Sequence, residues 1–178
     1  MRTRQFPLVI AATFMVTAVA CTAQRTSLSG KILAPKGDSV FVHWHHLVGE
    51  RTVSDLLASG RMDREGRFLL EFDLDSARTL AFSDDNEATE VYMLPGEALA
   101  LSLHTAYFDE TLRFSGDGAG RNNALAALSI SDEMNWLGVR EEEGADTVVL
   151  YRRIDAFTKK MAAALEDLAR EYPEMAGP

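Results

Sequence analysis

Hydrophobic and polar residues alternate in short runs between residues 27 and 116. Alternation with a period of two is typical of a β-strand that buries one face. Turn-forming residues separate the runs, as in Pro35-Lys36-Gly37-Asp38 and Pro95-Gly96. The runs cover 28–33, 39–47, 52–58, 68–72, 79–82, 90–94, 99–104 and 111–114. About eight short strands at this spacing are typical of an antiparallel sandwich or barrel, and we expect a β-sandwich over 27–119.

After Gly120 the hydrophobic period changes from two to three or four, which indicates helix. A first helix is expected to begin at Asn122 or Asn123, since either side chain suits an N-cap, and to continue through Leu125, Leu128 and Ile130.

A longer amphipathic helix is expected over 147–171, with Asp146 as its cap and Pro173 as its end. Its apolar positions are Leu150, Tyr151, Ile154, Phe157, Met161, Leu165 and Leu168. This apolar stripe must be covered, and the sequence allows three partners for it: the sandwich, the first helix, or another molecule. Residues 120–178 are therefore predicted to form a helical extension of the sandwich.

The first twenty residues have the pattern of an export signal. Arg2 and Arg4 precede an uncharged, largely apolar run from Phe6 to Ala20, which ends in Ala18-Val19-Ala20. A basic head, a short apolar core and a small-x-small exit predict a secretory signal peptide over 1–20. The run is shorter than the roughly 20 apolar residues of a bilayer span, which disfavours the alternative of an uncleaved anchor.

Cys21 stands where the mature chain would begin, and it is the only cysteine in the sequence. This position is that of a lipobox cysteine, although Ala18 stands where such boxes usually have Leu. We therefore predict that Cys21 is lipidated, with residues 21–26 as a tether to the sandwich. Several acyl chains on one residue anchor a protein stably, because each buried CH₂ contributes roughly 0.8 kcal/mol. The alternative is simple cleavage after Ala20, which would leave a free thiol.

The charge balance narrows the range of partners. The chain has a net charge of −9, and loss of Arg2 and Arg4 with the signal would make it −11. Such acidity disfavours nucleic acid and electrostatic binding to anionic lipid. With one cysteine the chain has neither an internal disulfide nor a CxxC redox pair.

Four stretches of the sequence match motifs of a known protein family. They are Ser29-Gly30-Lys31-Ile32-Leu33, Asp63-x-x-Gly66-x-Phe68, Val91-Tyr92-Met93-Leu94-Pro95-Gly96-Glu97 and Phe114-Ser115-Gly116-Asp117-Gly118-Ala119-Gly120-Arg121-Asn122-Asn123-Ala124-Leu125. Over roughly residues 27–125 the chain resembles the N-terminal domain of TlpA-type, thioredoxin-like lipoproteins of Bacteroidetes-like bacteria. The resemblance implies a β-sandwich that precedes a helical linker and a thioredoxin domain with a CxxC pair. Because this chain lacks that pair and ends at Pro178, we expect a stand-alone accessory domain or a truncated or split member without thiol-disulfide activity.

Three histidines are weak candidates for a metal site. In His43-Trp44-His45-His46, a strand would place His43 and His45 on one face and His46 on the other. His104, on another expected strand, would have to supply a third ligand for Zn²⁺ or Cu²⁺. Solvent-facing histidines are the simpler interpretation, so we predict neither a metal nor another cofactor.

Other polar motifs also favour structural roles. Asp84-Asp85-Asn86-Glu87 lacks the alternate spacing of a calcium loop and reads as a turn. Gly116-Asp117-Gly118-Ala119-Gly120 precedes a helix but lacks the Gly-Lys-Ser/Thr ending of a phosphate loop. Asp73, Asp75, Asp109 and Glu110 would work as acid and base only if folding brought them together.

These observations lead to one main hypothesis and two alternatives. The chain is predicted to be a lipid-anchored envelope protein that faces the periplasm, on the outer membrane in preference to the inner. It would serve as a non-catalytic accessory or interaction domain, with a protein partner bound through the C-terminal helix. The alternatives are a truncated or split thiol-disulfide oxidoreductase and a periplasmic ligand- or metal-binding protein.

Overall fold

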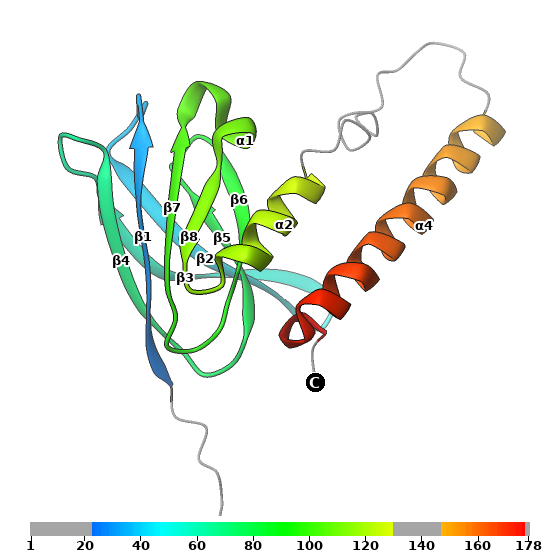
Figure 1. Cartoon of the computed structure of the whole chain (residues 1–178), viewed down its shortest axis with the longest axis horizontal. Helices are drawn as coiled ribbons and strands as arrows, with labels where there is room; N and C mark the ends of the chain where they lie inside the picture. The colour runs from blue at the N-terminus through cyan, green and yellow to red at the C-terminus, as the bar shows by residue number, and fades with distance from the viewer. Residues whose placement is uncertain (1–22, 130–146, 177–178) are drawn as a thin grey trace, which may run out of the picture.

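The computed structural model describes residues 23–129 and 147–176, and eight strands in two four-stranded sheets form its main part (Figure 1). The strands are β1 (Gln24–Leu33), β2 (Ser39–Val48), β3 (Arg51–Arg61), β4 (Arg67–Leu74), β5 (Arg78–Ser83), β6 (Ala88–Met93), β7 (Ala98–His104) and β8 (Arg113–Gly116). The predicted mainly β fold, with eight strands and a C-terminal helix, is confirmed.

The two sheets have the strand orders β4-β1-β7-β8 and β3-β2-β5-β6. All pairs are antiparallel except β1 and β7, which run parallel from Ser27 opposite Ala98 to Leu33 opposite His104. A parallel pair needs a long connection, and here the chain visits the second sheet between β1 and β7. The sandwich is therefore mostly antiparallel, as predicted, and contains one parallel pair of strands.

The core lies between the sheets, and strand alternation supplies it. Along β4 every second side chain is buried, from Phe68 to Leu74. The Phe68 ring lies 5.2 Å from the ring of Phe82 on β5, which belongs to the other sheet. Contacts of this kind hold the two sheets face to face. The most deeply buried large side chains are Phe82, Leu28, Ile32, Leu70, Leu74, Leu80, Met93, Leu99, Leu103, Val40, Val42 and Val91.

Each strand differs from its expected range by at least one residue, and at two boundaries the difference changes the expected role of a segment. β1 begins at Gln24, inside the range 21–26 expected as a tether, because Gln24 already pairs with Leu74. Thr111, expected to open the last strand, instead ends a short helix, α1 (Phe108–Thr111), which follows the 3₁₀ turn η1 (Thr105–Tyr107). Its hydroxyl accepts a hydrogen bond from the backbone N–H of His104, which closes this connection.

The β2–β3 hairpin extends beyond the neighbouring strand β5. β2 pairs with β3 from Ser39 to Val48, but with β5 only from Phe41 to His43. The outer half of the hairpin therefore extends past the sheet as a two-stranded ribbon.

In the described part of the chain the strands are followed by α2 (Ala119–Ser129), α4 (Thr147–Glu171) and a 3₁₀ turn, η2 (Pro173–Met175). The expected cap Asp146 and the expected helix residue Ile130 lie outside the described residues. α2 begins at Ala119, so Asn122 and Asn123 lie inside the helix and are not its N-cap as predicted. The C-terminal end of α4 lies beside the sandwich edge, and its N-terminal end points away (Figure 1).

Candidate functional site

The first turns of α2 join the two sheets at their edges. β6 and β8 are edge strands of opposite sheets. The Asn122 side-chain amide accepts a hydrogen bond from the Tyr92 N–H at 2.8 Å and donates one to the Tyr92 carbonyl at 2.9 Å. Asn123 pairs in the same way with the Phe114 N–H and carbonyl, at 2.9 and 3.0 Å. Each asparagine thus satisfies the backbone N–H and carbonyl of one residue on an edge strand.

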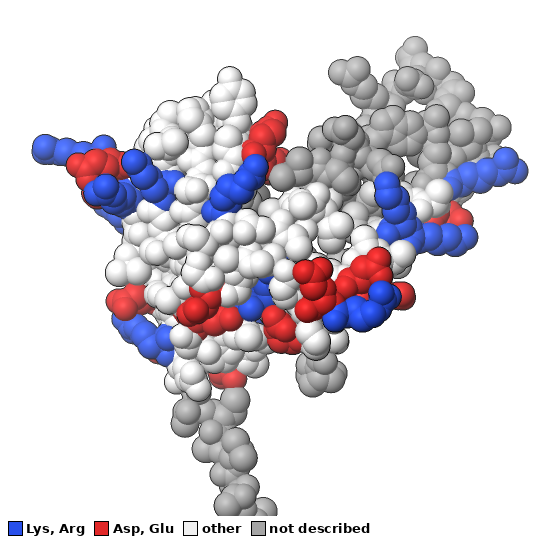
Figure 2. All heavy atoms as spheres, viewed as in Figure 1, with Lys and Arg blue, Asp and Glu red and all other residues white. Residues whose placement is uncertain are grey.

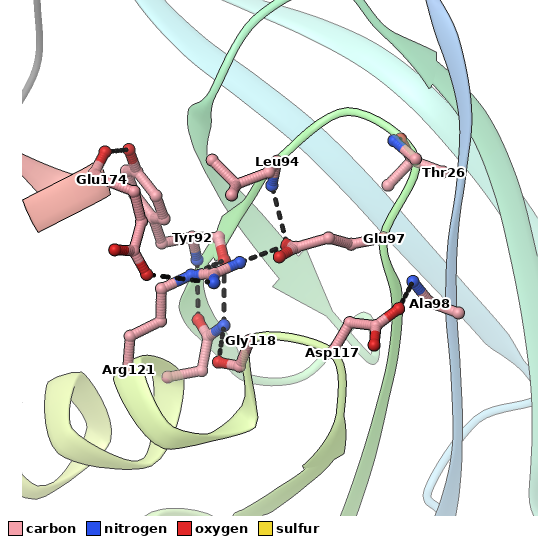
Figure 3. A network of polar contacts seen from close by, with 11 residues as sticks. Thr26, Tyr92, Leu94, Glu97, Ala98, Asp117, Gly118, Arg121 and Glu174 are labelled. Atoms are coloured by element: carbon pink, nitrogen blue, oxygen red, sulfur yellow. Dashed lines mark hydrogen bonds and ion pairs between the residues drawn. The ribbon is translucent and has the colours of Figure 1, made fainter. Parts of the chain in front are cut away.

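Arg121, the residue before this pair, is a buried charge whose side chain is only 5% exposed. Figure 3 shows its guanidinium between Glu97, Tyr92 and Glu174. It forms an ion pair with the Glu97 carboxylate, lies 3.5 Å from a Glu174 carboxylate oxygen, and donates to the Tyr92 carbonyl at 3.4 Å. Charge compensation and several hydrogen bonds offset the cost of removing a guanidinium from water.

The same cluster fixes the C-terminal end of the chain. The Tyr92 hydroxyl donates a hydrogen bond to the Glu174 carbonyl, and the Arg121 guanidinium lies 5.4 Å from the centre of the Tyr92 ring. Burial raises the pKa of Tyr92, against the opposing effect of the Arg121 charge. Leu168 of α4 is buried as well. We call Tyr92, Glu97, Arg121 and Glu174 the anchoring cluster, since it fixes the end of α4 to the sandwich.

The glycine-containing motifs have structural roles in the fold. Gly66 has φ +75°, and an added Cβ would lie 2.1 Å from the Ile32 carbonyl oxygen. One Asp63 carboxylate oxygen accepts the N–H groups of Glu65 and Arg67, both at 2.8 Å, and the hydrogen bond from Arg67 is the main reason that the pKa of Asp63 is lowered.

The stretch that resembled a phosphate loop is also a turn. Gly116 and Gly118 have φ of +84° and +68°, which favours glycine. The Asp117 carboxylate accepts the Ala98 N–H at 3.0 Å. A carboxylate in this position opposes an anionic ligand, so the turn serves to lead β8 into α2.

The histidines predicted as weak metal candidates do not share one site. His43 and His45 stack on β2 with ring centres 6.1 Å apart, and His43 Nδ1 lies 3.2 Å from the Ser54 hydroxyl. His104 is in the other sheet, where its Nδ1 accepts the Ala106 N–H and caps η1. Among the described residues, no three His, Cys, Asp or Glu side chains are grouped closely enough to hold a metal ion.

The acidic candidates likewise serve local structure or lie apart in the fold. Asp84 is buried, and its carboxylate accepts the N–H groups of Asn86 and Glu87, which makes the predicted turn. Asp73 and Asp75 lie at the end of β4, whereas Asp109 and Glu110 lie in α1.

A hollow next to Trp44 was not foreseen from the sequence. The Arg78 guanidinium lies 3.7 Å from the centre of the Trp44 ring, and the His46 ring stacks on Trp44 at 3.9 Å. An open hollow of about 250 Å³ adjoins them. It is lined by Ala23, Trp44, Asp55, Leu57, Asp73, Leu74, Asp75 and Arg78. The Arg78 hydrogen bond to Asp75, at 2.6 Å, is the main cause of the lowered pKa of Asp75.

The outer face of α4 carries the other unusual surface. Tyr151, Ile154 and Leu165 are 69%, 39% and 46% exposed, although all three are large and apolar. A hollow of about 510 Å³ lies between the end of α4 and η2. It is lined by Ala162, Leu165, Glu166, Leu168, Ala169, Met175 and Ala176. Exposed apolar side chains gathered on one helix face are typical of an interaction surface.

No helix in the described part of the chain has the length and apolar content needed to cross a bilayer. Cys21 lies outside the described residues.

No protein-family model matches the chain, and no curated protein matches it. A 9R-lipoxygenase from Cyanothece PCC8801 is similar in structure over 67% of this chain and 24% of its own, with 17% identity and a TM-score of 0.29.

Proposed function

We propose that this chain is an envelope lipoprotein, anchored through Cys21, that works as a non-catalytic interaction module. The proposal joins two features of the chain. The N-terminal sequence has the order of a basic head, an apolar run and a single cysteine. The resemblance of residues 27–125 to an accessory domain of envelope lipoproteins favours the same location.

The exposed apolar face of α4 is the observation that carries the interaction role. Tyr151 and Leu165 present large side chains to water, 69% and 46% exposed. Removing such area from water stabilises a complex by roughly 25 cal/mol per Å² before the costs of association. A helix face of this kind is best explained by a partner that covers it.

The anchoring cluster supports this role because it presents the helix in one orientation. Arg121 and Tyr92 contact Glu174, three residues beyond the end of α4. The sandwich would be held close to the membrane at the start of β1, where the Ser27 N–H donates a hydrogen bond to the carbonyl of Glu97 in the anchoring cluster. β1 begins three residues after Cys21, and an extended segment of that length spans only about 10 Å.

The surface part of the proposal is tested by photo-crosslinking in cells. A crosslinking amino acid replaces Leu165 on α4 or, as the matched control, Leu69 on β4, which is 62% exposed. We expect a defined adduct from position 165 and none from position 69. Equal labelling at both positions, or none at either, would contradict a specific role for the α4 face.

The anchor part is tested by cell fractionation. Cys21→Ser should move the protein from the membrane fraction to the soluble fraction, because the serine cannot form the thioether to lipid. Thr22→Ser, which keeps Cys21, should remain in the membrane. Retention of Cys21→Ser in the membrane with its lipid label would refute the lipid anchor.

A further inference from the structure

The exposed face of α4 has a symmetric arrangement of side chains. Among the exposed positions of α4, one row contains Tyr151, Ile154, Thr158, Ala162 and Leu165, with spacings of three, four, four and three residues. Residues at these spacings lie on one side of a helix. The order of spacings is the same in both directions from Thr158. Two copies of the helix that cross antiparallel at Thr158 would therefore place Tyr151 against Leu165 of the partner subunit and Ile154 against Ala162 of the partner subunit.

The two halves of α4 carry opposite net charges. Residues 147–160 contain Arg152, Arg153, Lys159 and Lys160 with one acid, a net charge of +3. Residues 161–171 contain Glu166, Asp167 and Glu171 with one arginine, a net charge of −2. In Figure 2 basic side chains lie along the N-terminal part of α4, and acidic side chains gather around its C-terminal end. An antiparallel pair brings unlike halves together, whereas a parallel pair opposes like charges.

Arg152 and Glu166 are the two charged residues whose positions favour an antiparallel pair of α4 helices. Each directly follows one of the two outermost apolar positions, Tyr151 and Leu165, so both lie on the same flank of the stripe. Both are exposed, and neither belongs to an ion pair among the described residues, unlike Lys159, which pairs with Asp155 at 2.7 Å. In the antiparallel pair, Arg152 of one subunit would face Glu166 of the partner subunit, and the two-fold axis would repeat this contact.

We propose that a second copy of this chain covers the exposed face of α4, in an antiparallel, two-fold symmetric pair centred on Thr158. This inference rests on the proposed function and names its partner. The contact is isologous, so it closes after two subunits and forms no filament. One helix pair buries a small area, and anchoring both subunits in one membrane would raise their effective concentration.

The first test measures the mass of the full-length protein extracted in detergent, over a range of concentrations. We expect a monomer–dimer equilibrium. Arg152→Glu alone and Glu166→Arg alone should each weaken it about tenfold, since each change introduces two repulsive contacts. The double variant Arg152→Glu/Glu166→Arg should restore the wild-type affinity, and Arg64→Glu, in the β3–β4 turn, should leave it unchanged. A double variant as weak as the single ones would overturn the proposed register.

The second test determines the orientation by thiol crosslinking in the same preparation. A short bismaleimide should link Thr158→Cys subunits to each other, because position 158 meets its own copy. Leu165→Cys subunits should not link to each other, since the two copies of position 165 lie about 21 Å apart along the axis. Subunits with Tyr151→Cys mixed with Leu165→Cys subunits should link. Linking of Leu165→Cys to itself would indicate a parallel pair and refute the proposal.

The two proposals fail differently. A protein that stays monomeric at all concentrations, while position 165 still gives an adduct with a different protein in cells, refutes self-association and leaves the interaction role standing. A monomer that gives no adduct from position 165 refutes both. Binding of α4 to lipid vesicles instead of a second copy also refutes self-association.

Discussion

Asn122 and Asn123 are adjacent in the chain, yet their side chains complete the hydrogen bonding of opposite sheets. Asn122 pairs with Tyr92 on the edge of one sheet, and Asn123 pairs with Phe114 on the edge of the other. Two amides in one helix turn therefore link the two sheets, because each bonds to the backbone groups of one edge-strand residue. The same turn carries Arg121, so the link between the sheets and the attachment of α4 depend on three successive residues.

Replacing Asn122 with Asp should destabilise the fold strongly. Asn122 is 1% exposed, and the carboxylate would remove the donor to the Tyr92 carbonyl and place a charge beside it. We expect a loss of about 3 kcal/mol in the free energy of unfolding. Asn86→Asp, in an exposed turn, should cost less than about 0.5 kcal/mol. Urea unfolding measures both, and equal midpoints for the two variants would contradict the role given to Asn122.

Arg121 and Glu97 should show strong coupling in a double-mutant cycle. Arg121→Met leaves the Glu97 carboxylate, 14% exposed, without its main partner, which we expect to cost about 3–5 kcal/mol. Glu97 keeps one hydrogen bond, from the Leu94 N–H at 2.8 Å. Adding Glu97→Gln to Arg121→Met should therefore recover part of the loss. Additive effects of the two substitutions in urea unfolding would show that the pair is not coupled.

Gly66 and Gly37 should respond in opposite ways to alanine. Gly66→Ala forces a φ of +75° on a residue with a side chain and drives its Cβ into the Ile32 carbonyl, so we expect a loss of at least about 2 kcal/mol. Gly37 has open space around it and no positive φ, so Gly37→Ala should be neutral or stabilising by up to about 1 kcal/mol. Thermal unfolding of the two variants compares them directly. Similar melting temperatures would contradict the close approach at Gly66.

Asp63 should contribute to the acid limb of the stability curve. Its pKa is lowered in the folded protein, mainly by the hydrogen bond from the Arg67 N–H. A lowered carboxyl pKa stabilises the folded state above the unfolded-state pKa of about 3.9, and this contribution disappears as the pH falls through the lowered value. Asp63→Asn should therefore reduce stability at pH 7 and flatten its decline on acidification. An acid limb in Asp63→Asn that is identical to that of the wild type would exclude this role.

The sequence predicted the elements better than their arrangement. Strands such as β4 and β7 were predictable because their alternation and flanking turns are local signals. The parallel pairing of β1 with β7 was not, because it depends on which strands meet after the chain has crossed between sheets. The Asn122-Asn123 pair has the local chemistry of a helix cap. Its actual partners, the free edges of β6 and β8, exist only once both sheets have formed.

For the candidate surfaces, too, the local pattern was predictable from the sequence and the tertiary contacts were not. The apolar stripe of α4 was predicted from its spacing, but three destinations remained open, and only the structure distinguishes the buried Leu168 from the exposed Tyr151. Arg121 gave no signal of burial, since an arginine on a short helix usually faces water. The stacking of Arg78 on Trp44 also depends on the approach of two strands that are remote in sequence.

The central claim, a lipid-anchored envelope protein, is tested most directly by intact-mass spectrometry of the chain isolated from its native membranes. We expect a polypeptide that begins at Cys21 and carries acyl chains on that residue. A chain that begins at Met1, or one that begins at Cys21 with an unmodified thiol, would contradict it.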